Sequence, residues 1–367
     1  MILGIPKEPK HENRVAILPE LIEQIKKLNL SVIVEKGAGE NAFASDEMYA
    51  SAGAEVVNRD ELFSKADIIL QINPPSEDEV SKFKEGQSLI SFLQPLVQPN
   101  LSEKLAAKKV TGLSFEMIPR TTRAQTMDVL SSQATIAGYK AVLLAAANLP
   151  KFFPMLTTAA GSIPPAKILI IGAGVAGLMA IATARRLGGV VEAFDTRPAV
   201  KEEVKSLGAK FVEVEGAADA SKAGGYAVEQ TEEYKKKQSE LIAKHSIMSD
   251  VIITTAQIPG RKAPLLITKD TLDKMKSGSV IIDLASSTGG NCEMSKDNET
   301  VHYNGITIIG NSNIPSTMPY DASKMFGKNA LSLLKILIKD GNIDINMNDD
   351  IIKGMCVTHN GENFLKK

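Results

Sequence analysis

Short apolar segments alternate with amphipathic segments along the first third of the chain. The opening run "MILGIP" has the length and composition of a strand. The segment "LPELIEQIKKLNL" predicts a helix whose apolar face carries Leu18, Leu21, Ile22, Ile25 and Leu28. Further apolar runs follow as predicted strands: "SVIVEKG", "ADIILQIN", "QSLISFLQ" and "VTGLSFEMI". Near-continuous apolar strands separated by helices predict a parallel sheet covered on both faces.

The same alternation returns in the second half of the chain. A long helix is predicted from near Met127 towards Asn148, and a proline-rich stretch follows it. Six strands with helices between them then predict a doubly wound dinucleotide fold: "AKILIIG", "VVEAFD", "KFVEV", "DVIITTA", "SVIIDLA" and "ITIIG". The segment "DASKMFGKNALSLLKILIKDG", after Pro319, predicts a final helix that packs back on the first domain.

These patterns predict an α/β protein with two Rossmann-like doubly wound parallel-sheet domains and a cleft between them. The first domain is predicted to be discontinuous, with residues 1–131 and 319–367, and the second to span residues 132–318. A chain of 367 residues fits two domains at roughly 100–200 residues each.

Bulk composition excludes several classes of protein. The net charge of −1 gives no electrostatic reason to bind nucleic acid or an acidic membrane surface. Cys292 and Cys356 make no disulfide framework and have no metal-ligand spacing to the four histidines, so no metal site is predicted. A reducing, cytosolic compartment is expected. The uncharged run at residues 168–184 is slightly short for a membrane span and contains three glycines, which predicts a buried strand leading into a helix.

The strongest local motif is Gly172-x-Gly174-x-x-Gly177, which follows the strand "KILIIG" and opens a helix. In a dinucleotide fold the first glycine permits the tight turn, the second lets pyrophosphate approach the backbone, and the third lets helix and strand pack closely. The helix N-terminus, with Val175 and Ala176, then offers N–H groups to the phosphates.

An acidic residue closes the next predicted strand, "VVEAFD". A carboxylate at Asp195 would accept hydrogen bonds from the adenosine ribose and repel the extra phosphate of NADP, which favours NAD(H). Arg197 is the counter-argument, since arginine can bind that phosphate. Its alternative role is a solvated loop residue or a contact to the adenine.

The connection "EGAADASKAGGYAVEQ" is long for this fold. Its glycines and Tyr226 suggest a lid that closes over the bound cofactor. A plain surface insertion is an equal alternative. The lysine run 235–237 beyond it is most simply a solvated helix face.

The segment "RTTRAQTMDVLSSQ", residues 120–133, joins an apolar strand to the long helix. Two arginines, a glutamine, an aspartate and several hydroxyls gather there. One interpretation is a charged surface turn in which Asp128 caps the helix.

The segments "RAQTMDVLSSQATIAGYKAV", "GAGVAGLMAIATARRLG", "AFDTRPAVKEEVKSLGAKFVEVE", "GGYA", "IPGRKAP" and "GGNCE" resemble domain I, the NAD(H)-binding component, of proton-translocating nicotinamide nucleotide transhydrogenases. The resemblance covers nearly the whole chain. It implies direct hydride transfer between NADH on this chain and NADP⁺ on a partner subunit, with a membrane subunit that couples the transfer to proton translocation. It also implies a homodimer at the cytoplasmic face of the inner membrane. Because the sequence carries no membrane helices after this domain, it looks like a separate alpha-1 subunit.

The resemblance also assigns site residues. Arg120, Gln125 and Asp128, with Ser131, match the family's catalytic loop at the nicotinamide, where Arg120 and Asp128 are expected to pair and Gln125 to face the NADP(H) domain. The remaining positions are implied as cofactor-binding: Arg120, Thr121, Thr122, Arg123, Gly172, Gly174, Val175, Ala176, Gly177, Asp195, Thr196, Arg197, Gly225, Tyr226, Gln238 and Gln257. Relatives usually carry leucine at the last of these, so the affinity for NADH is expected to differ from theirs.

The nearest alternative is an alanine dehydrogenase, which shares the two-domain fold. Arg14 matches that family's arginine for the substrate carboxylate. The family's lysine, histidine and aspartate fall instead at Asn73, Gln94 and Ser287, which cannot exchange a proton at neutral pH. Hydride exchange between two nicotinamides needs only alignment of the rings. A third alternative is a non-enzymatic module that binds or senses NAD.

Overall fold

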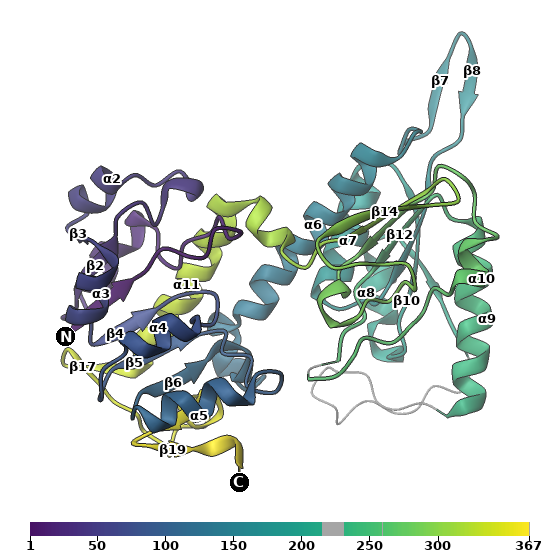
Figure 1. Ribbon diagram of the computed structural model, residues 1–367. Coiled ribbons are helices and arrows are strands. Elements are labelled where there is room, and N and C mark those ends of the chain that lie inside the picture. The colour runs from purple at the N-terminus through teal and green to yellow at the C-terminus, as the bar shows by residue number, and fades with distance from the viewer. Residues whose placement is uncertain (215–230, 259, 367) are drawn as a thin grey trace. The chain divides into compact units, whose positions relative to one another are not determined.

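The computed structural model describes residues 1–214, 231–258 and 260–366 (Figure 1). The chain divides into two compact units. Unit 1 consists of Met1–Gln133 with Pro315–Lys367, and unit 2 of Ala134–Ile314.

Unit 1 is built on an eight-stranded sheet. In spatial order its strands are β19 (Glu362–Asn363), β18 (Cys356–His359), β6 (Thr111–Ser114), β5 (Ser88–Ser91), β4 (Ile68–Leu70), β1 (Ile2–Ile5), β2 (Ser31–Glu35) and β3 (Glu55–Val57). The first six strands of the chain are parallel, and β18 and β19 add an antiparallel edge. The predicted parallel sheet is therefore confirmed, and the short β3 and the two C-terminal strands were not predicted.

The helices of unit 1 cover this sheet: α1 (Ile22–Lys26), α2 (Asp46–Ser51), α3 (Arg59–Lys65), α4 (Glu77–Lys82), α5 (Pro99–Ala107), α11 (Pro319–Leu337) and α12 (Asp350–Met355). Four of the five apolar residues of the predicted first helix are buried, and Leu28 is half-buried. The apolar stripe of α11, with Phe326 and Leu334, lies in the same core as Leu3 and Ile5, so its predicted packing on the first domain is confirmed. It is not the final helix, since the hairpin of β16 (Ile338–Lys339) and β17 (Asn342–Ile343) and then α12 follow it.

Unit 2 holds a seven-stranded sheet. Its order is β11 (Lys210–Val212), β10 (Val190–Phe194), β9 (Lys167–Ile171), β12 (Val251–Thr254), β13 (Val280–Asp283), β15 (Ile306–Gly310) and β14 (Glu299–Tyr303). The six parallel strands follow the doubly wound order 3-2-1-4-5-6, as predicted. The antiparallel edge strand β14 was not predicted, because its residues are largely exposed and lack an apolar run.

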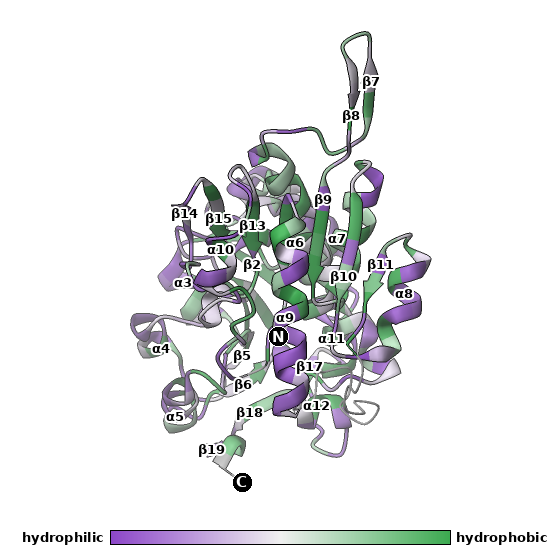
Figure 2. Ribbon diagram, turned by 90° about the vertical axis from the view of Figure 1, so that its right-hand side faces the viewer, coloured by the Kyte–Doolittle hydropathy of each residue, from purple (hydrophilic) through white to green (hydrophobic). Residues whose placement is uncertain are grey.

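Helices α7 (Val175–Arg186), α8 (Lys201–Ser206), α9 (Glu232–Met248) and α10 (Lys269–Leu272) belong to this unit. The uncharged run at residues 168–184 lies in β9 and α7, so the predicted buried strand leading into a helix is confirmed. Figure 2 shows α9 as mostly hydrophilic beside the apolar strands. Its Lys235 and Lys237 pair with Glu232 and Glu233 one turn away, which confirms a solvated helix face.

The long helix α6 (Val129–Asn148) runs from unit 1 into unit 2. It is the one helix among the described residues that is long and apolar enough to cross a membrane, and 39% of its most apolar window is buried within the protein. A two-stranded hairpin, β7 (Leu156–Thr158) and β8 (Gly161–Ile163), follows it and projects from the body of unit 2 (Figure 1).

Candidate functional site

The carboxyl ends of the parallel strands in unit 2 bring the predicted dinucleotide residues to one edge. β9 and β12 are neighbours in the sheet, and the chain leaves them towards opposite sides. Ligands of doubly wound sheets bind at this switch point, outside the carboxyl ends of the strands. The glycine turn follows β9, Asp195 follows β10, and Gln257 lies three residues after β12.

The glycine turn has the backbone that the motif requires. Gly172 has φ of +102°, which side chains rarely adopt. A Cβ at Gly177 would lie 1.8 Å from the carbonyl oxygen of Gly172, so only glycine lets α7 pack this closely on the end of β9. A Cβ at Gly174 would meet no atom within 4 Å. This open space at the start of α7, beside half-buried Ala176 and exposed Val175, is where a pyrophosphate can approach the N–H groups.

A second close contact supports the turn from behind. A Cβ at Gly138, in α6, would lie 2.1 Å from the carbonyl oxygen of Ala176. Helix α6 therefore contacts the first turn of α7 at Gly138 with no side chain between them. This contact helps to position the N-terminus of α7. Sequence reasoning missed Gly138, since a glycine inside a helical pattern has no distinctive spacing.

Asp195 is held in place by the backbone on either side. Its Oδ2 accepts a hydrogen bond from the N–H of Ala173 at 2.7 Å, and its Oδ1 accepts one from the N–H of Arg197 at 2.8 Å. The guanidinium of Arg197 also donates to both carboxylate oxygens, through Nε at 2.9 Å and Nη2 at 2.8 Å. This carboxylate raises the pKa of Arg197. The side chain of Asp195 is 6% exposed, so the ion pair of Asp195 and Arg197 is largely buried. Thr196, between them in the sequence, is half-buried.

Tyr234 of α9 lies within electrostatic range of Asp195. Burial raises the pKa of the Tyr234 hydroxyl, and the negative charge of Asp195 adds to the rise. Gln238 follows one helical turn later, on the same face of α9, and is half-buried. Gly225 and Tyr226, with the whole predicted lid of residues 215–230, lie outside the described residues.

The segment after β12 forms a second wall at the glycine turn. The hydroxyl of Thr255 donates to the carbonyl oxygen of Gly172 at 3.1 Å. The side-chain amide of Gln257 donates to the carbonyl oxygen of Leu284 at 2.8 Å, while the residue remains exposed. The polar Gln257 is thus tied to the neighbouring strand end.

The side chain of fully buried Asn291 forms hydrogen bonds to the segment after β12. Its Nδ2 donates to the carbonyl oxygens of Ala256 and Pro264, at 2.9 and 2.8 Å, and its Oδ1 accepts from the N–H of Ala256 at 3.1 Å. Asp283, which is also fully buried, accepts the N–H of Asn291 at 2.8 Å. Sequence reasoning did not assign either residue. The motif "GGNCE" was the available signal, because a buried amide next to paired glycines suggests a turn tied by side-chain hydrogen bonds.

In unit 1 the predicted nicotinamide loop follows β6. Residues Thr122–Met127 form a 3-10 helix, and Arg120, Thr121, Thr122, Arg123 and Gln125 are all exposed. Asp128 accepts hydrogen bonds from the N–H and the hydroxyl of Ser131, at 2.9 and 2.5 Å, directly before α6 begins. The helix-capping role of Asp128 is therefore confirmed. Arg123 forms a two-pronged ion pair with Asp349, at 2.7 and 2.6 Å.

Comparison with known proteins identifies the family. Residues 4–137 match the alanine dehydrogenase/PNT N-terminal domain, and residues 141–366 match the alanine dehydrogenase/PNT C-terminal domain. The chain belongs to this family.

Within the family the chain is most similar to transhydrogenase subunits among the relatives compared. It is 45% identical over 366 residues to NAD(P) transhydrogenase subunit alpha of Haemophilus influenzae, which covers 99% of this chain and 71% of that protein. It is also 45% identical over 372 residues to an NAD(P) transhydrogenase subunit alpha protein of Rhodospirillum rubrum, with 98% of this chain and 97% of that protein covered. A crystal structure of transhydrogenase from Sinorhizobium meliloti superposes with a TM-score of 0.90 at 42% identity, over 99% of this chain and 100% of that chain.

Alanine dehydrogenases are more distant members of the family. The enzyme of Methanococcus maripaludis is 31% identical over 331 residues, or 87% of this chain and 82% of that protein. A solved L-alanine dehydrogenase shares the fold, with a TM-score of 0.81. The resemblance to transhydrogenase and the predicted fold class are both confirmed.

The four residues that the sequence comparison with alanine dehydrogenase singled out, Arg14, Asn73, Gln94 and Ser287, all lie among the described residues. Arg14 is buried and gives Nε and Nη2 to the two carboxylate oxygens of Glu12, at 2.8 and 2.6 Å. Its Nη1 donates to the side chain of Gln133 at 2.8 Å. Gln94 lies in a left-handed turn with φ of +51°, and Ser287 is exposed.

One carboxyl group of unit 1, that of Glu8, has a pKa near neutrality. Burial raises the pKa of Glu8 to about 7, against the lowering effect of its hydrogen bonds. Its oxygens accept from the N–H of Ile72 at 2.6 Å and from the side chain of Asn73 at 2.9 Å. Glu8 is only 7% exposed, and both of its oxygens accept hydrogen bonds from within the protein.

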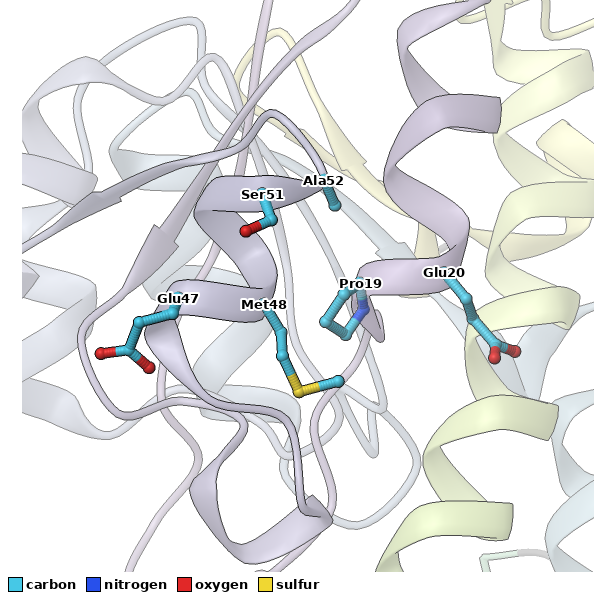
Figure 3. Close-up of a pocket in the computed structure, with 6 residues that line it drawn as sticks. All are labelled: Pro19, Glu20, Glu47, Met48, Ser51 and Ala52. Carbon is cyan, nitrogen blue, oxygen red and sulfur yellow. The ribbon is translucent and has the colours of Figure 1, made fainter.

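An open hollow on the surface of unit 1 contains none of these residues. It is lined by Pro19, Glu20, Glu47, Met48, Ser51 and Ala52. Figure 3 shows Met48 and Pro19 close together, with the carboxylates of Glu20 and Glu47 pointing away to either side. Among the described residues, no group of three or more histidine, cysteine, aspartate or glutamate side chains is placed to hold a metal ion.

Proposed function

We propose that this chain is the NAD(H)-binding subunit of a proton-translocating NAD(P)⁺ transhydrogenase. In this proposal, bound NADH supplies a hydride that passes directly to NADP⁺ held by a partner subunit. A membrane subunit couples the transfer to proton translocation. Similarity to subunit alpha proteins over nearly the whole of this chain supports the proposal.

The observation that carries the proposal is that Asp195 and the glycine turn lie together at the carboxyl ends of neighbouring strands of unit 2. The space that a Cβ at Gly174 would fill lies at the N-terminus of a helix of twelve residues, where N–H groups and the helix dipole favour a pyrophosphate. Asp195 stands at the next strand end, where a carboxylate accepts hydrogen bonds from ribose hydroxyls. These residues fit an NAD(H) molecule.

The same carboxylate supports NAD(H) over NADP(H). A second negative charge at the ribose would lie against Asp195. Arg197, which could offset it, already gives its guanidinium to Asp195. We therefore assign Arg197 to the ordering of Asp195 and Thr196 and not to a phosphate.

For the nicotinamide end we propose Arg120, Gln125, Asp128 and Ser131. Asp128 and Ser131 hold each other through two hydrogen bonds. Arg120 and Gln125 are exposed from the same loop and have the donors and acceptors that a carboxamide and a ribose require. None of these four side chains is assigned a proton transfer, since hydride exchange requires only alignment of the two rings.

We also propose a homodimer at the cytoplasmic face of the inner membrane, reached through the membrane partner. Large apolar side chains are exposed on α6 and beside the β7–β8 hairpin: Leu130, Tyr139, Phe152, Met155 and Ile163. An isolated two-stranded hairpin is marginally stable in water, so a covering partner is expected. Sedimentation of the wild type and of Met155→Asp tests this arrangement. A monomeric wild type would contradict it.

Reconstitution tests the function. The purified chain is mixed with the NADP(H)-binding and membrane subunits, and reduction of an NADP⁺ analogue by NADH is followed. Transfer is expected in the mixture and not with the chain alone. Reduction of NAD⁺ by alanine with the chain alone would overturn the proposal in favour of a dehydrogenase, and NADH binding without transfer would favour a sensing module.

A further inference from the structure

The segment of residues 120–128, here called the 120–128 loop, exposes Arg120, Arg123 and Gln125 and is unusual in its backbone. Six of its residues, Thr122–Met127, form one 3-10 helix. Runs of this helix longer than three or four residues are uncommon, because their hydrogen bonds are poorly aligned. The loop therefore needs support from outside itself to keep a single shape.

Part of that support comes from Ala124 and Met127, whose side chains are buried in the core of unit 1, and part comes from the far end of the sequence. The guanidinium of Arg123 donates to Oδ2 and Oδ1 of Asp349, at 2.7 and 2.6 Å, and also to Asp350. Two parallel hydrogen bonds between a guanidinium and a carboxylate fix orientation as well as distance. The two residues are 226 positions apart in the sequence.

Asp349 is itself immobilised. Its Oδ1 also accepts hydrogen bonds from the N–H groups of Ile351 and Ile352, at 2.9 and 3.2 Å, so it caps α12. Both isoleucines are buried in the core of unit 1. The carboxylate that Arg123 contacts is thus joined to the core, although Arg123 is 51% exposed.

Further contacts fix the loop on either side of Arg123. A Cβ at Gly354 in α12 would lie 3.0 Å from Cδ of Pro119, so α12 packs on the chain directly before the loop. The side-chain amide of Asn329 in α11 donates to the carbonyl oxygen of Thr126 at 2.7 Å. Asp128 caps α6 where the loop ends. Buried residues of α11 and α12 belong to the same core of unit 1.

We propose that Asp349 is a positioning residue for hydride transfer: it holds Arg123, and with Asn329 it keeps Arg120 and Gln125 of the 120–128 loop in the geometry that the nicotinamide requires. The inference rests on the proposed function for its catalytic consequence. It assigns Arg123 to the support of the loop and not to contact with the cofactor.

The variant Asp349→Asn tests this assignment. Asparagine caps helices about as well as aspartate, so α12 is retained while the charged two-pronged contact is lost. With the partner subunits, the maximal transfer rate is expected to fall about ten-fold or more, since small misplacements at a reacting centre are costly. The NADH dissociation constant is expected to change less than about three-fold, because the pyrophosphate and ribose contacts lie in unit 2.

A readout on the chain alone separates the positioning role from the proposed function. Tryptic cleavage after Arg120 and Arg123 is expected to accelerate several-fold in Asp349→Asn, without a matching change in the thermal midpoint. Asp344→Asn is the control, since it removes an exposed carboxylate that pairs with Lys339 in the same C-terminal segment. It is expected to alter neither cleavage nor transfer.

A double-mutant cycle completes the test. Arg123→Gln should lower the transfer rate as Asp349→Asn does, and the double variant should be no slower than either single variant. Additive losses, or an Arg123→Gln variant that weakens NADH binding while Asp349→Asn does not, would show that Arg123 contacts the cofactor and would overturn the proposal. If wild-type transfer fails while the cleavage result holds, the proposed function is wrong and the support of the loop stands.

Discussion

Replacement of Gly174 by alanine separates cofactor binding from folding at the glycine turn. A Cβ at Gly174 has no neighbour within 4 Å, whereas a Cβ at Gly177 lies 1.8 Å from the Gly172 carbonyl oxygen. The φ of Gly174 is −79°, which alanine adopts without strain. The same methyl group therefore enters open space in one variant and a backbone contact in the other.

The magnitudes follow from these two environments. In Gly177→Ala, the end of β9 or the start of α7 must move by about 1 Å or more, and overpacking of this kind typically costs about 1–3 kcal/mol. In Gly174→Ala, the loss of a glycine N-cap is offset by the lower entropy of the unfolded chain, so stability changes by less than about 1 kcal/mol. The new methyl group nevertheless occupies the approach of the pyrophosphate. Loss of a charge-assisted hydrogen bond there costs about 1.5–3 kcal/mol, or roughly ten- to one-hundred-fold in affinity.

Two measurements check the prediction. Thermal unfolding is expected to leave Gly174→Ala within about 2 °C of the wild type and to lower Gly177→Ala by several degrees, at roughly 2–4 °C per kcal/mol. Titration with NADH, followed by its fluorescence in a chain without tryptophan, should show weakened binding in Gly174→Ala. Wild-type affinity in Gly174→Ala, or an unchanged midpoint in Gly177→Ala, would refute the reasoning.

Three further substitutions probe other parts of the site. Asp195→Asn should raise the dissociation constant of NADH at least about ten-fold and make the affinities for NADH and NADPH more alike. Titrations with each coenzyme measure the two dissociation constants, and an unchanged ratio between them would contradict the specificity argument. The raised pKa of Glu8, about 7 against an ordinary 4.5, means that its contribution to stability is complete below 4.5 and is lost as the pH rises to 7, by up to about 3 kcal/mol. In urea unfolding, the free energy of unfolding of Glu8→Gln should therefore fall less than that of the wild type between about pH 5 and about pH 8. The same pH dependence in both proteins would exclude the effect. Asn291→Ala removes the side-chain partner of three partly buried backbone groups and should lower the free energy of unfolding in urea by about 2 kcal/mol or more, whereas exposed Asn148→Ala should change it by no more than about 0.5 kcal/mol.

The features that the sequence predicted well are local. The glycine turn, the acidic strand end at Asp195 and the capping of α6 by Asp128 each depend on a few consecutive residues, so periodicity and turn chemistry reveal them. The central parallel strands are continuous apolar runs for the same reason. Their order in the sheet of unit 2 is that of the doubly wound fold, which the alternation of strands and helices predicted.

The features that were missed depend on contacts between distant segments. Nothing near Asp349 indicates that it meets Arg123, because each is an ordinary surface charge in its own segment. The pairing of β18 with β6 and the contact of Gly138 with Ala176 have the same origin. Arg14 and Glu12 are only two residues apart, yet their pairing matters because both are buried, which a local pattern cannot show.

The buried polar residues of unit 1 explain how one fold can serve two reactions. Arg14 is neutralised by Glu12, and the side chain of Asn73 donates to Glu8 at 2.9 Å and to Glu12 at 3.3 Å. A lysine in place of Asn73 would add a cation between two buried carboxylates, where its charge would be offset and its proton held. Contact of a substrate with Arg14 would therefore require release of its guanidinium from Glu12. Replacement of Asn73 alone would change the charge of the network that Glu8, Glu12, Arg14 and Asn73 form. The guanidinium of Arg14 could contact a substrate only if its ion pair with Glu12 were also broken.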